Sequence, residues 1–356
     1  MRRTKLRIHA DRSALAPGQR HVAMLYPFWG KNLEIAGEPD TGRFNEYTSH
    51  GRELFELTSL AEADVTVLAG EWIAGGGTPQ AYNYCELSRK MGKPLIIFFN
   101  SDSDEEIPID GAIIFRTSAY RSRRRSNEFG LPAWPEDFVG VYHSGNLPIR
   151  SKNIKPVVGY CGYGTIHPFI QANVVYNILA KIPLVSNLTI RKGASSSMGF
   201  RSTILRFLAR SSEVQTNFLL RKRFWNGAVV NGAFDLKRAQ QSRAEYINNM
   251  FDSDYIVCAR GAGNFSFRFY EVLCSGRIPL FIDTDCLLPF DQWINWRDYC
   301  LWVDKTDIAH IAERLAAFHK SLSSVAFEEL QYSIRHLWLD WLSPMGFFSQ
   351  IHRYLT

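Results

Sequence analysis

The segment from Tyr255 to Asp283 constrains the possible folds of this chain more than any other. It starts with an apolar run at 255–258, passes through a glycine-bearing turn into a helical stretch that opens near Phe265, and ends on a second apolar run at 278–282. Short apolar runs bounded by glycine and proline are typical of buried strands in parallel sheets. The segment therefore predicts a strand–helix–strand unit of an α/β fold.

The turn of this unit has the composition of a phosphate site. Backbone N–H groups and the positive end of the helix dipole converge where the helix begins. Arg260 and Arg268 add two guanidinium groups, while Gly261 and Gly263 either let the backbone approach a ligand closely or simply form a tight turn. Ser266 can bond a phosphate oxygen, cap the helix, or do both. These residues predict a site for a nucleotide diphosphate.

Two residues outside the turn extend this site. Glu271 follows Arg268 by one helical turn and can accept hydrogen bonds from ribose or sugar hydroxyls, the alternative being an ion pair with Arg268. Arg201 opens a predicted helix at 200–210 and would bind the phosphates from there. The alternative for Arg201, as for Arg260, is a surface arginine or a structural ion pair.

The same motifs resemble the exostosin family of glycosyltransferases, and they are more similar to its compact bacterial-type members than to the animal heparan sulfate polymerases. The similarity is strong over residues 246–302, weaker back to about residue 156, and loose in the N-terminal third. The motifs that carry it are Arg260-Gly261, Ser266-Phe267-Arg268-Phe269-Tyr270-Glu271, Gly276-Arg277-Ile278-Pro279, Leu288-Pro289-Phe290 and Asn295-Trp296.

The resemblance implies a fold, a reaction and a use for two residues. The fold is GT-B, in which two Rossmann-like doubly wound α/β domains face a central cleft. The reaction is the inverting transfer of a hexosyl or pentosyl group from a nucleotide-diphosphate donor, expected to be UDP-linked, to a hydroxyl of a growing surface glycan or polysaccharide of the cell envelope. Glu271 resembles the family glutamate that faces the donor. Arg201 resembles an arginine that follows the opening strand of the second domain.

The chain of 356 residues is long enough for two domains, each with a full core. Alternating strand and helix patterns predict a Rossmann-like acceptor-side domain at 1–150 and a Rossmann-like nucleotide-sugar-binding domain at 151–330, with a linker-like stretch at 142–156. A helical segment at 331–356 would pack back on the first domain. The predicted strands are 21–26, 65–69, 95–100, 112–115 and 156–162, and the predicted helices are 51–62, 79–91, 167–180, 200–210, 242–251, 307–320 and 327–341.

An inverting displacement also needs a base for the acceptor hydroxyl, and three residues are candidates. Glu71 follows the predicted strand at 65–69, and Asp102 follows the one at 95–100. Ligands of open α/β sheets bind beyond the carboxyl ends of the strands, so both carboxylates have a suitable position. His50 is the third candidate. The alternative for each is an ordinary solvated loop residue.

Three D-x-D sequences raise the question of a metal site: Asp102-Ser-Asp104, Asp252-Ser-Asp254 and Asp283-Thr-Asp285. A carboxylate pair after a strand can hold a divalent cation under a diphosphate. In this chain the arginines and the helix dipole already supply the counter-charge, so we expect no metal and no cofactor other than the nucleotide sugar. Asp283 and Asp285 follow a strand and would then contact the donor sugar.

Charge and cysteine content bound the partners and the compartment. Lys and Arg exceed Asp and Glu by 41 to 35, which suits an anionic substrate, and no zinc-finger, RNA-binding or basic-zipper pattern points to nucleic acid. The basic run at 121–125 is a solvated loop or a contact for an anionic acceptor or membrane. The six scattered cysteines and the lack of an apolar leader or an 18-residue apolar run predict a cytoplasmic protein, with peripheral contact at the inner membrane face as an alternative.

The expected partners are therefore a nucleotide-sugar donor and a glycan or lipid-linked glycan acceptor. Two other functions stay open. One is a non-catalytic glycan-binding partner subunit of a glycosyltransferase complex, and the other is a GT-B nucleotide-sugar epimerase. The intact set of donor-site residues favours transfer over both.

Overall fold

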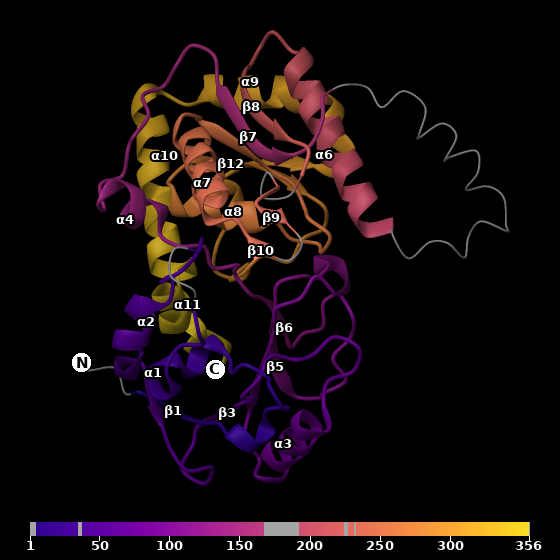
Figure 1. The fold of residues 1–356 in the computed structure, drawn as a ribbon, viewed down its shortest axis with the longest axis vertical. Coiled ribbons are helices and arrows are strands. Elements are labelled where there is room, and N and C mark those ends of the chain that lie inside the picture. The colour runs from indigo at the N-terminus through magenta and orange to yellow at the C-terminus, as the bar shows by residue number, and fades with distance from the viewer. Residues whose placement is uncertain (1–4, 35–37, 167–191, 224–226, 231–232, 356) are drawn as a thin grey trace, which may run out of the picture.

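The computed structural model describes residues 5–34, 38–166, 192–223, 227–230 and 233–355. Figure 1 shows two α/β units, one above the other, each built around its own sheet. We use "N-terminal half" for residues 5–134 around the first sheet and "C-terminal half" for residues 155–337 around the second. The sheets and their helices confirm the predicted two-domain, Rossmann-like α/β architecture.

The first sheet has six parallel strands in the order β2-β1-β3-β4-β5-β6. The strand order reverses between β1 and β3, and ligands of such sheets bind beyond the carboxyl ends of the strands at this reversal. All five side chains of β4 are buried, as expected for a central strand covered on both faces. The strands are β1 (Leu6–His9), β2 (Phe55–Leu57), β3 (Val65–Val67), β4 (Leu95–Phe99), β5 (Ala112–Arg116) and β6 (Glu128–Gly130).

Two predicted elements of this half are wrong. The apolar run at 21–26 is not a strand: it forms a helical turn that continues into α1 (Tyr26–Trp29), because Pro27 suits a first helical turn and Gly30 then ends the helix at a φ of 84°. The stretch at 51–62 is not a helix: it contains β2, whose Phe55 pairs with Leu6 of β1. Strand β1 itself is absent from the prediction.

The remaining helices of this half lie where the chain offers them a start signal. In α3 (Pro79–Lys90) the Thr78 side chain accepts a hydrogen bond from the N–H of Ala81 at 3.1 Å, and proline occupies the first helical position. Helix α2 (Asn45–His50) leads to β2, and α4 (Phe138–His143) begins at Asp137, whose carboxylate caps it, in the segment that joins the two halves.

The second sheet has five parallel strands in the order β13-β12-β11-β7-β8, so its order reverses between β7 and β11. This is the second position at which a ligand is expected. The strands are β7 (Val157–Tyr163), β8 (Gln215–Arg221), β11 (Tyr255–Cys258), β12 (Ile278–Asp283) and β13 (Leu301–Asp304), and an antiparallel pair, β9 (Val229–Val230) and β10 (Ala233–Phe234), lies outside the sheet.

The helices of the C-terminal half agree with most of the sequence pattern. The predicted helix at 167–180 lies outside the described residues. Strand β8 is not in the prediction. The helices are α6 (Lys192–Arg210), α7 (Leu236–Phe251), α8 (Phe267–Cys274), α9 (Ile311–Ser321) and α10 (Ser324–Leu337), followed by a π-helical turn at Trp338–Leu342 and by α11 (Pro344–Gln350).

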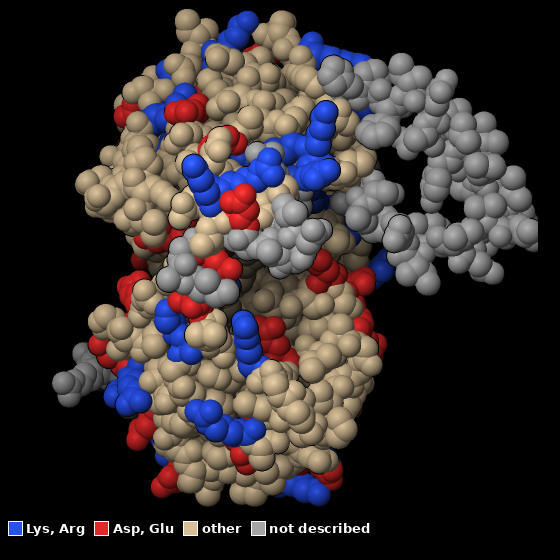
Figure 2. Space-filling model, viewed as in Figure 1, with Lys and Arg blue, Asp and Glu red and all other residues tan. Residues whose placement is uncertain are grey.

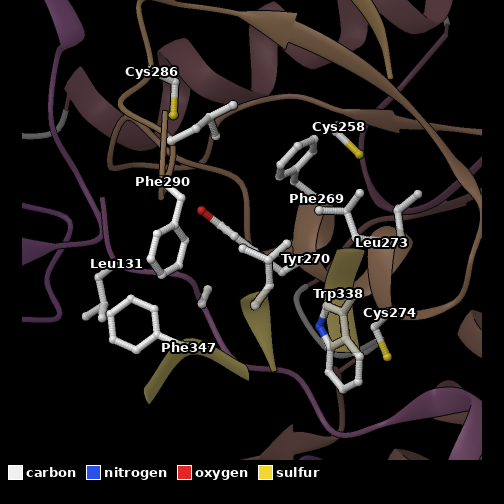
Figure 3. Close-up of a cluster of buried hydrophobic side chains, with 14 of the residues drawn as sticks. Leu131, Cys258, Phe269, Tyr270, Leu273, Cys274, Cys286, Phe290, Trp338 and Phe347 are labelled. Carbon is white, nitrogen blue, oxygen red and sulfur yellow. The ribbon is translucent and has the colours of Figure 1, made fainter. Parts of the chain in front are cut away.

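The final segment of the chain crosses from the C-terminal half to the N-terminal half (Figure 1). The ring of Phe348 on α11 stacks on Tyr47 of α2 with centroids 4.2 Å apart, and Phe347 contacts Phe115 of β5. Figure 3 shows Phe347 beside Leu131 and near Phe290, so residues of three separate chain segments form one hydrophobic cluster at the junction, in which the rings of Phe290 and Phe347 are in contact. Aromatic contacts of this kind bind the two halves together.

The six cysteines are buried and free of disulfides. This agrees with the prediction that they act as small hydrophobic side chains. Among the described residues, no helix combines the length and the apolar character that a membrane span requires.

Replacing Phe348 with alanine should lower the free energy of unfolding by about 3–5 kcal/mol, because it removes a fully buried ring and leaves a cavity between α11 and the first sheet. Urea unfolding followed by tryptophan fluorescence measures the change. Val325→Ala, at a position 65% exposed, is the matched control and should leave the unfolding midpoint unchanged. A Phe348→Ala protein as stable as the Val325→Ala control would show that the C-terminal segment does not stabilise the N-terminal half.

Candidate functional site

The main pocket lies at the carboxyl ends of β7, β8 and β11, where the strand order of the second sheet reverses. Its volume is about 530 Å³. In the space-filling view, Lys and Arg side chains gather on the C-terminal half above a hollow between the two halves (Figure 2). The pocket is lined by Asp40, Asp102, Tyr160, Cys161, Gly162, Tyr163, Arg201, Arg221, Arg223, Ser242, Arg243, Tyr246, Ala259, Gly261, Ala262, Phe265, Ser266, Phe267, Arg268 and Glu271.

The turn before α8 forms one wall of this pocket. Gly261 donates a backbone hydrogen bond to the carbonyl of Phe265 at 2.9 Å, which closes the turn. Ser266 occupies the N-cap position of α8, yet its hydroxyl makes no capping hydrogen bond. Because Ser266 also lines the pocket, its hydroxyl and the first N–H groups of α8 are available to an anionic ligand.

Arg201 and Arg268 reach the pocket from two helices and bond neutral oxygen atoms. Arg201 of α6 donates through Nε and Nη2 to the carbonyl of Arg260, at 3.2 and 3.1 Å. Arg268 of α8 donates to the carbonyl of Cys161 at 2.6 Å and to the hydroxyl of Tyr246 at 3.2 Å. Among the described residues, no carboxylate forms an ion pair with either guanidinium. Both positive charges are thus free to attract phosphate.

Glu271 lies deeper in the same pocket. Its carboxylate accepts a hydrogen bond from the hydroxyl of Tyr246 and lies 3.6 Å from Nη1 of Arg243. Burial raises the pKa of Glu271, whereas the charge of Arg243 lowers it. The ion pair that the sequence suggested with Arg268 is thus made with Arg243 instead.

Four of the predicted donor-site residues do not line the pocket. Arg260 turns to the N-terminal half, where Nη1 donates to the hydroxyl of Tyr120 at 2.9 Å, and only its carbonyl serves the pocket, through Arg201. Gly263 packs against Asp102: a Cβ at this position would lie 2.8 Å from the Asp102 backbone. Asp283 and Asp285 bind the segment 121–122 of the N-terminal half.

These contacts belong to a larger set, here called the interdomain clamp, which joins residues 118–124 to Asn264, Asp283, Asp285 and Asp291. Asn264, in the turn before α8, donates its N–H to Ser118 Oγ at 2.9 Å and its amide to the Ala119 carbonyl at 3.0 Å. Arg121 pairs with Asp283 at 3.0 Å, and Arg124 with Asp291 at 2.7 Å.

The clamp gives the basic run at 121–125 a structural role. Arg121 and Arg124 form the ion pairs between the halves. Arg125 pairs with Glu106 within the N-terminal half, and the guanidinium of Arg123 lies 4.9 Å from the centroid of the Tyr120 ring. The run therefore holds the two halves together, and the turn before α8 is fixed from the N-terminal half.

The three candidate bases lie in different surroundings. Asp102 follows β4 and lines the pocket. Glu71 follows β3, next to the reversal of the first sheet, near Asn100 and Arg43. Glu71 is exposed, but the surrounding protein partly desolvates its carboxyl group and raises its pKa to about 7, while the Asn100 amide and Arg43 lower it. His50 is exposed at the end of α2, with its ring 3.1 Å from the Glu46 carbonyl, and does not line the pocket.

The structure adds residues that the sequence analysis missed. Arg221 and Arg223 stand at the end of β8, Tyr160 in the middle of β7, and Arg243 and Tyr246 on α7. A signal for Arg243 was present, because it lies four residues after the buried Ala239 and four before the buried Ile247, and an arginine on the apolar face of a helix is rare without a partner. No local pattern marks Asp40, which enters the pocket from the N-terminal half.

None of the D-x-D pairs forms a metal centre within the described part of the chain, where no three His, Cys, Asp or Glu side chains come together as ligands. Asp254 instead accepts from Arg150 at 2.6 Å and from the Val157 N–H at 2.8 Å. It fixes the connection into β7.

Comparison with known proteins bears on the C-terminal half. Residues 165–318 match the model of the Exostosin GT47 domain. The chain is 32% identical over 99 residues to the "Exostosin-1 homolog" of Caenorhabditis elegans, covering 28% of this chain and 25% of that protein. It is 29% identical over 87 residues to the "Probable beta-1,4-xylosyltransferase IRX10L" of Arabidopsis thaliana, covering 24% of this chain and 20% of that protein. These matches confirm the family resemblance, and the matched parts span a quarter or less of the length of these relatives.

One solved structure that aligns with this chain is the "Crystal structure of GtfA/B complex bound to UDP and GlcNAc", at 12% sequence identity and a TM-score of 0.29, covering 82% of this chain and 56% of that chain. The fold assignment rests on the two parallel sheets themselves.

Glu71→Gln should change how stability depends on pH. The pKa of Glu71 is about 7 in the folded protein against 4.5 as its ordinary value, so the unfolded chain loses this proton first and wild-type stability falls as the pH rises from about 4.5 through 7. The variant lacks this loss. Urea unfolding at pH 5 and pH 8 should therefore show a smaller decrease for Glu71→Gln than for wild type. The exposed Glu53 provides the control, Glu53→Gln, and equal decreases in all three proteins would contradict the raised pKa.

Proposed function

We propose that this chain is a glycosyltransferase that transfers a sugar from a nucleotide-diphosphate donor, UDP-linked, to a hydroxyl of a growing glycan, and the match of residues 165–318 to the Exostosin GT47 domain supports this. The observation that carries the proposal is the pocket at the start of α8. There Arg201 and Arg268, whose bonded partners are neutral, meet the uncapped helix N-terminus beside Ser266.

The donor is held by charge and by hydrogen bonds. The diphosphate lies at the N-terminus of α8, where the backbone N–H groups, the Ser266 hydroxyl and the two guanidinium groups donate to its oxygens. Glu271 accepts hydrogen bonds from ribose or sugar hydroxyls, since a carboxylate can accept from two neighbouring hydroxyls at once. Arg221 and Arg223 add positive charge at the end of β8.

The transfer is an in-line displacement at the anomeric carbon. The acceptor oxygen attacks from the face opposite the nucleotide, the bond from the carbon to the diphosphate oxygen breaks, and the configuration inverts. The charge that develops on the leaving diphosphate is stabilised by Arg201, Arg268 and the dipole of α8, so no metal is part of the proposal.

The proton of the acceptor hydroxyl passes to a carboxylate of the N-terminal half. We assign this to Glu71, with Asp102 as the alternative. A base with a pKa near 7 combines an ionised population with proton affinity at neutral pH, and this is the pKa of Glu71. Asp102 lies closer to the donor, since it lines the pocket. Membrane contact is not part of the proposal, because Arg121, Arg124 and Arg125 are engaged in ion pairs.

Arg201→Met should weaken UDP binding about tenfold to hundredfold, because it removes hydrogen bonds from a charged group to the diphosphate. Isothermal titration calorimetry in buffer containing EDTA measures this affinity and tests metal independence at the same time. Arg210→Met, an exposed arginine on the same helix, is the control and should bind like wild type. Wild-type binding that appears only after manganese is added would refute the metal-free site. A protein that binds no nucleoside diphosphate under either condition would instead support a non-catalytic glycan-binding partner.

Glu71→Gln should lower turnover about a hundredfold or more while UDP affinity is unchanged, because the variant keeps the shape of the side chain but cannot take the proton. Release of UDP from a panel of nucleotide sugars measures turnover, and the wild-type rate should rise with pH through about 7 as Glu71 ionises. Asp102→Asn is assayed beside it, with Glu53→Gln as the control. Near-normal rates for both Glu71→Gln and Asp102→Asn would exclude both residues as the base.

A further inference from the structure

Arg243 connects three chain segments at the wall of the main pocket. On α7, its Nη2 lies 2.5 Å from Glu136 and 3.1 Å from Asp40, and its Nη1 lies 3.6 Å from Glu271. Nε donates a further hydrogen bond to Glu136 at 3.0 Å. The guanidinium also lies 4.6 Å from the centroid of the Phe138 ring. One side chain thus bridges the donor helix α8, the segment between the halves, and a turn of the N-terminal half.

The turn that contains Asp40 has an unusual backbone. Asp40 adopts a φ of 64°, in the left-handed region that few residues other than glycine, asparagine and aspartate enter. Its carboxylate accepts from Nη2 of Arg243 and from the backbone N–H of Glu136 at 3.2 Å. Asp40 also lines the pocket. The position of this turn at the pocket therefore depends on a cation supplied by the other half.

Arg243 is buried, and its charge needs this arrangement. Burial opposes the charged form, but Glu271, Asp40 and Glu136 together hold the pKa of Arg243 above its ordinary value. The ionised form of Glu271 depends in turn on Arg243: burial raises the pKa of Glu271, and Arg243 lowers it most strongly. The other groups that face Glu271 are Tyr246 of α7, Arg268 of its own helix, Asp40 of the turn, and the thiols Cys161, Cys258 and Cys274.

We propose that Arg243 is a positioning residue that ties the Glu271 carboxylate of the donor pocket to the Asp40 turn of the N-terminal half, so that nucleotide binding and the ordering of this turn stabilise each other. The inference rests on the proposed function, since it takes the nucleotide as the ligand of Glu271. A ligand that requires Glu271 ionised and oriented selects the arrangement in which Arg243 contacts both carboxylates. By linkage, a well-ordered Asp40 turn then strengthens nucleotide binding by the same factor.

The proposed role of Arg243 differs from that of the interdomain clamp. The clamp fixes the turn before α8 through Ser118, Ala119 and Asn264, and none of its contacts involves Glu271. Arg243 instead reaches the carboxylate that receives the ligand. A purely structural arginine would change stability without changing how the Asp40 turn responds to nucleotide.

Hydrogen exchange of the full chain with and without UDP tests the proposal. In wild type, UDP should slow exchange both in the donor segment at 255–275 and in the Asp40 turn at 38–48. In Arg243→Met, UDP should bind about tenfold more weakly, and at saturating UDP the donor segment should still be protected while the turn exchanges as in the free protein. The control is Arg238→Met, an exposed arginine on the same helix, which should behave as wild type.

Asp40→Asn is the second variant, because Arg243→Met leaves buried carboxylates without their cation and can fail to fold. Asparagine tolerates the left-handed backbone of position 40, so this variant keeps the turn and removes only the charge. It should weaken UDP binding about fivefold and uncouple the turn from UDP in the same way. If Arg243→Met does not fold, Asp40→Asn decides.

The pH dependence of UDP binding gives a readout that a structural role would not move. Loss of Arg243 removes the strongest influence that lowers the pKa of Glu271, so this pKa is higher in Arg243→Met than in wild type. When the pH is lowered, Arg243→Met should therefore lose its affinity for UDP at a higher pH than wild type does.

The possible failures are distinguishable. If UDP protects 255–275 in wild type, and 38–48 responds to UDP in Arg243→Met and Asp40→Asn as it does in wild type, the coupling is wrong and the proposed function stands. If UDP protects neither segment of the wild-type protein, the proposed function and the coupling fall together.

Discussion

The strands of both sheets point their carboxyl ends toward one cleft. The rest of the structure depends on the contacts that hold the two sheets in this orientation. In a parallel sheet the loops that can bind a ligand gather at that edge. A site composed from two sheets therefore needs the sheets to be held face to face. Three kinds of contact do this here: the polar clamp around Asn264 and Asp283, the aromatic cluster of α11, and the buried ion pairs of Arg243.

The arginines of the pocket differ in whether a carboxylate already neutralises them, and this difference decides which of them can attract an anionic ligand. Five arginines and three carboxylates line the pocket. Arg243 is committed to carboxylates, and Arg221 is shared with Glu245, whereas Arg201 and Arg268 hold neutral oxygens. The pocket therefore separates cations that maintain the protein from cations that remain available to a ligand. Ser266 leaves the start of α8 uncapped, so the first N–H groups of this helix are also available to a ligand.

Sequence patterns predicted the parts of this structure that are determined locally. The strand, turn and helix from β11 to β12 were recognisable because apolar run, glycine and helix start follow one another within a single segment. The stretch at 51–62 was misjudged because β2 is only three residues long and is defined by its pairing with β1. For the site, Arg201, Ser266, Arg268 and Glu271 were identified and do line the pocket, but Arg260 was assigned to it and turns away. Its partner Tyr120 is 140 residues distant in the chain, and no local pattern reports such a contact.

The position of β7 has a consequence for how this chain can be divided. The segment that matches the exostosin model begins at residue 165, just after β7 ends at Tyr163, yet β7 is an inner strand of the second sheet and pairs with both β8 and β11. A fragment cut at the boundary of the match would lose an inner strand and leave two strand edges unpaired, and the turn before α8 would lack its contacts with Ser118 and Ala119. The matched region is thus not an independent folding module, and the main pocket, which Asp40 and Asp102 of the N-terminal half also line, is a property of the whole chain.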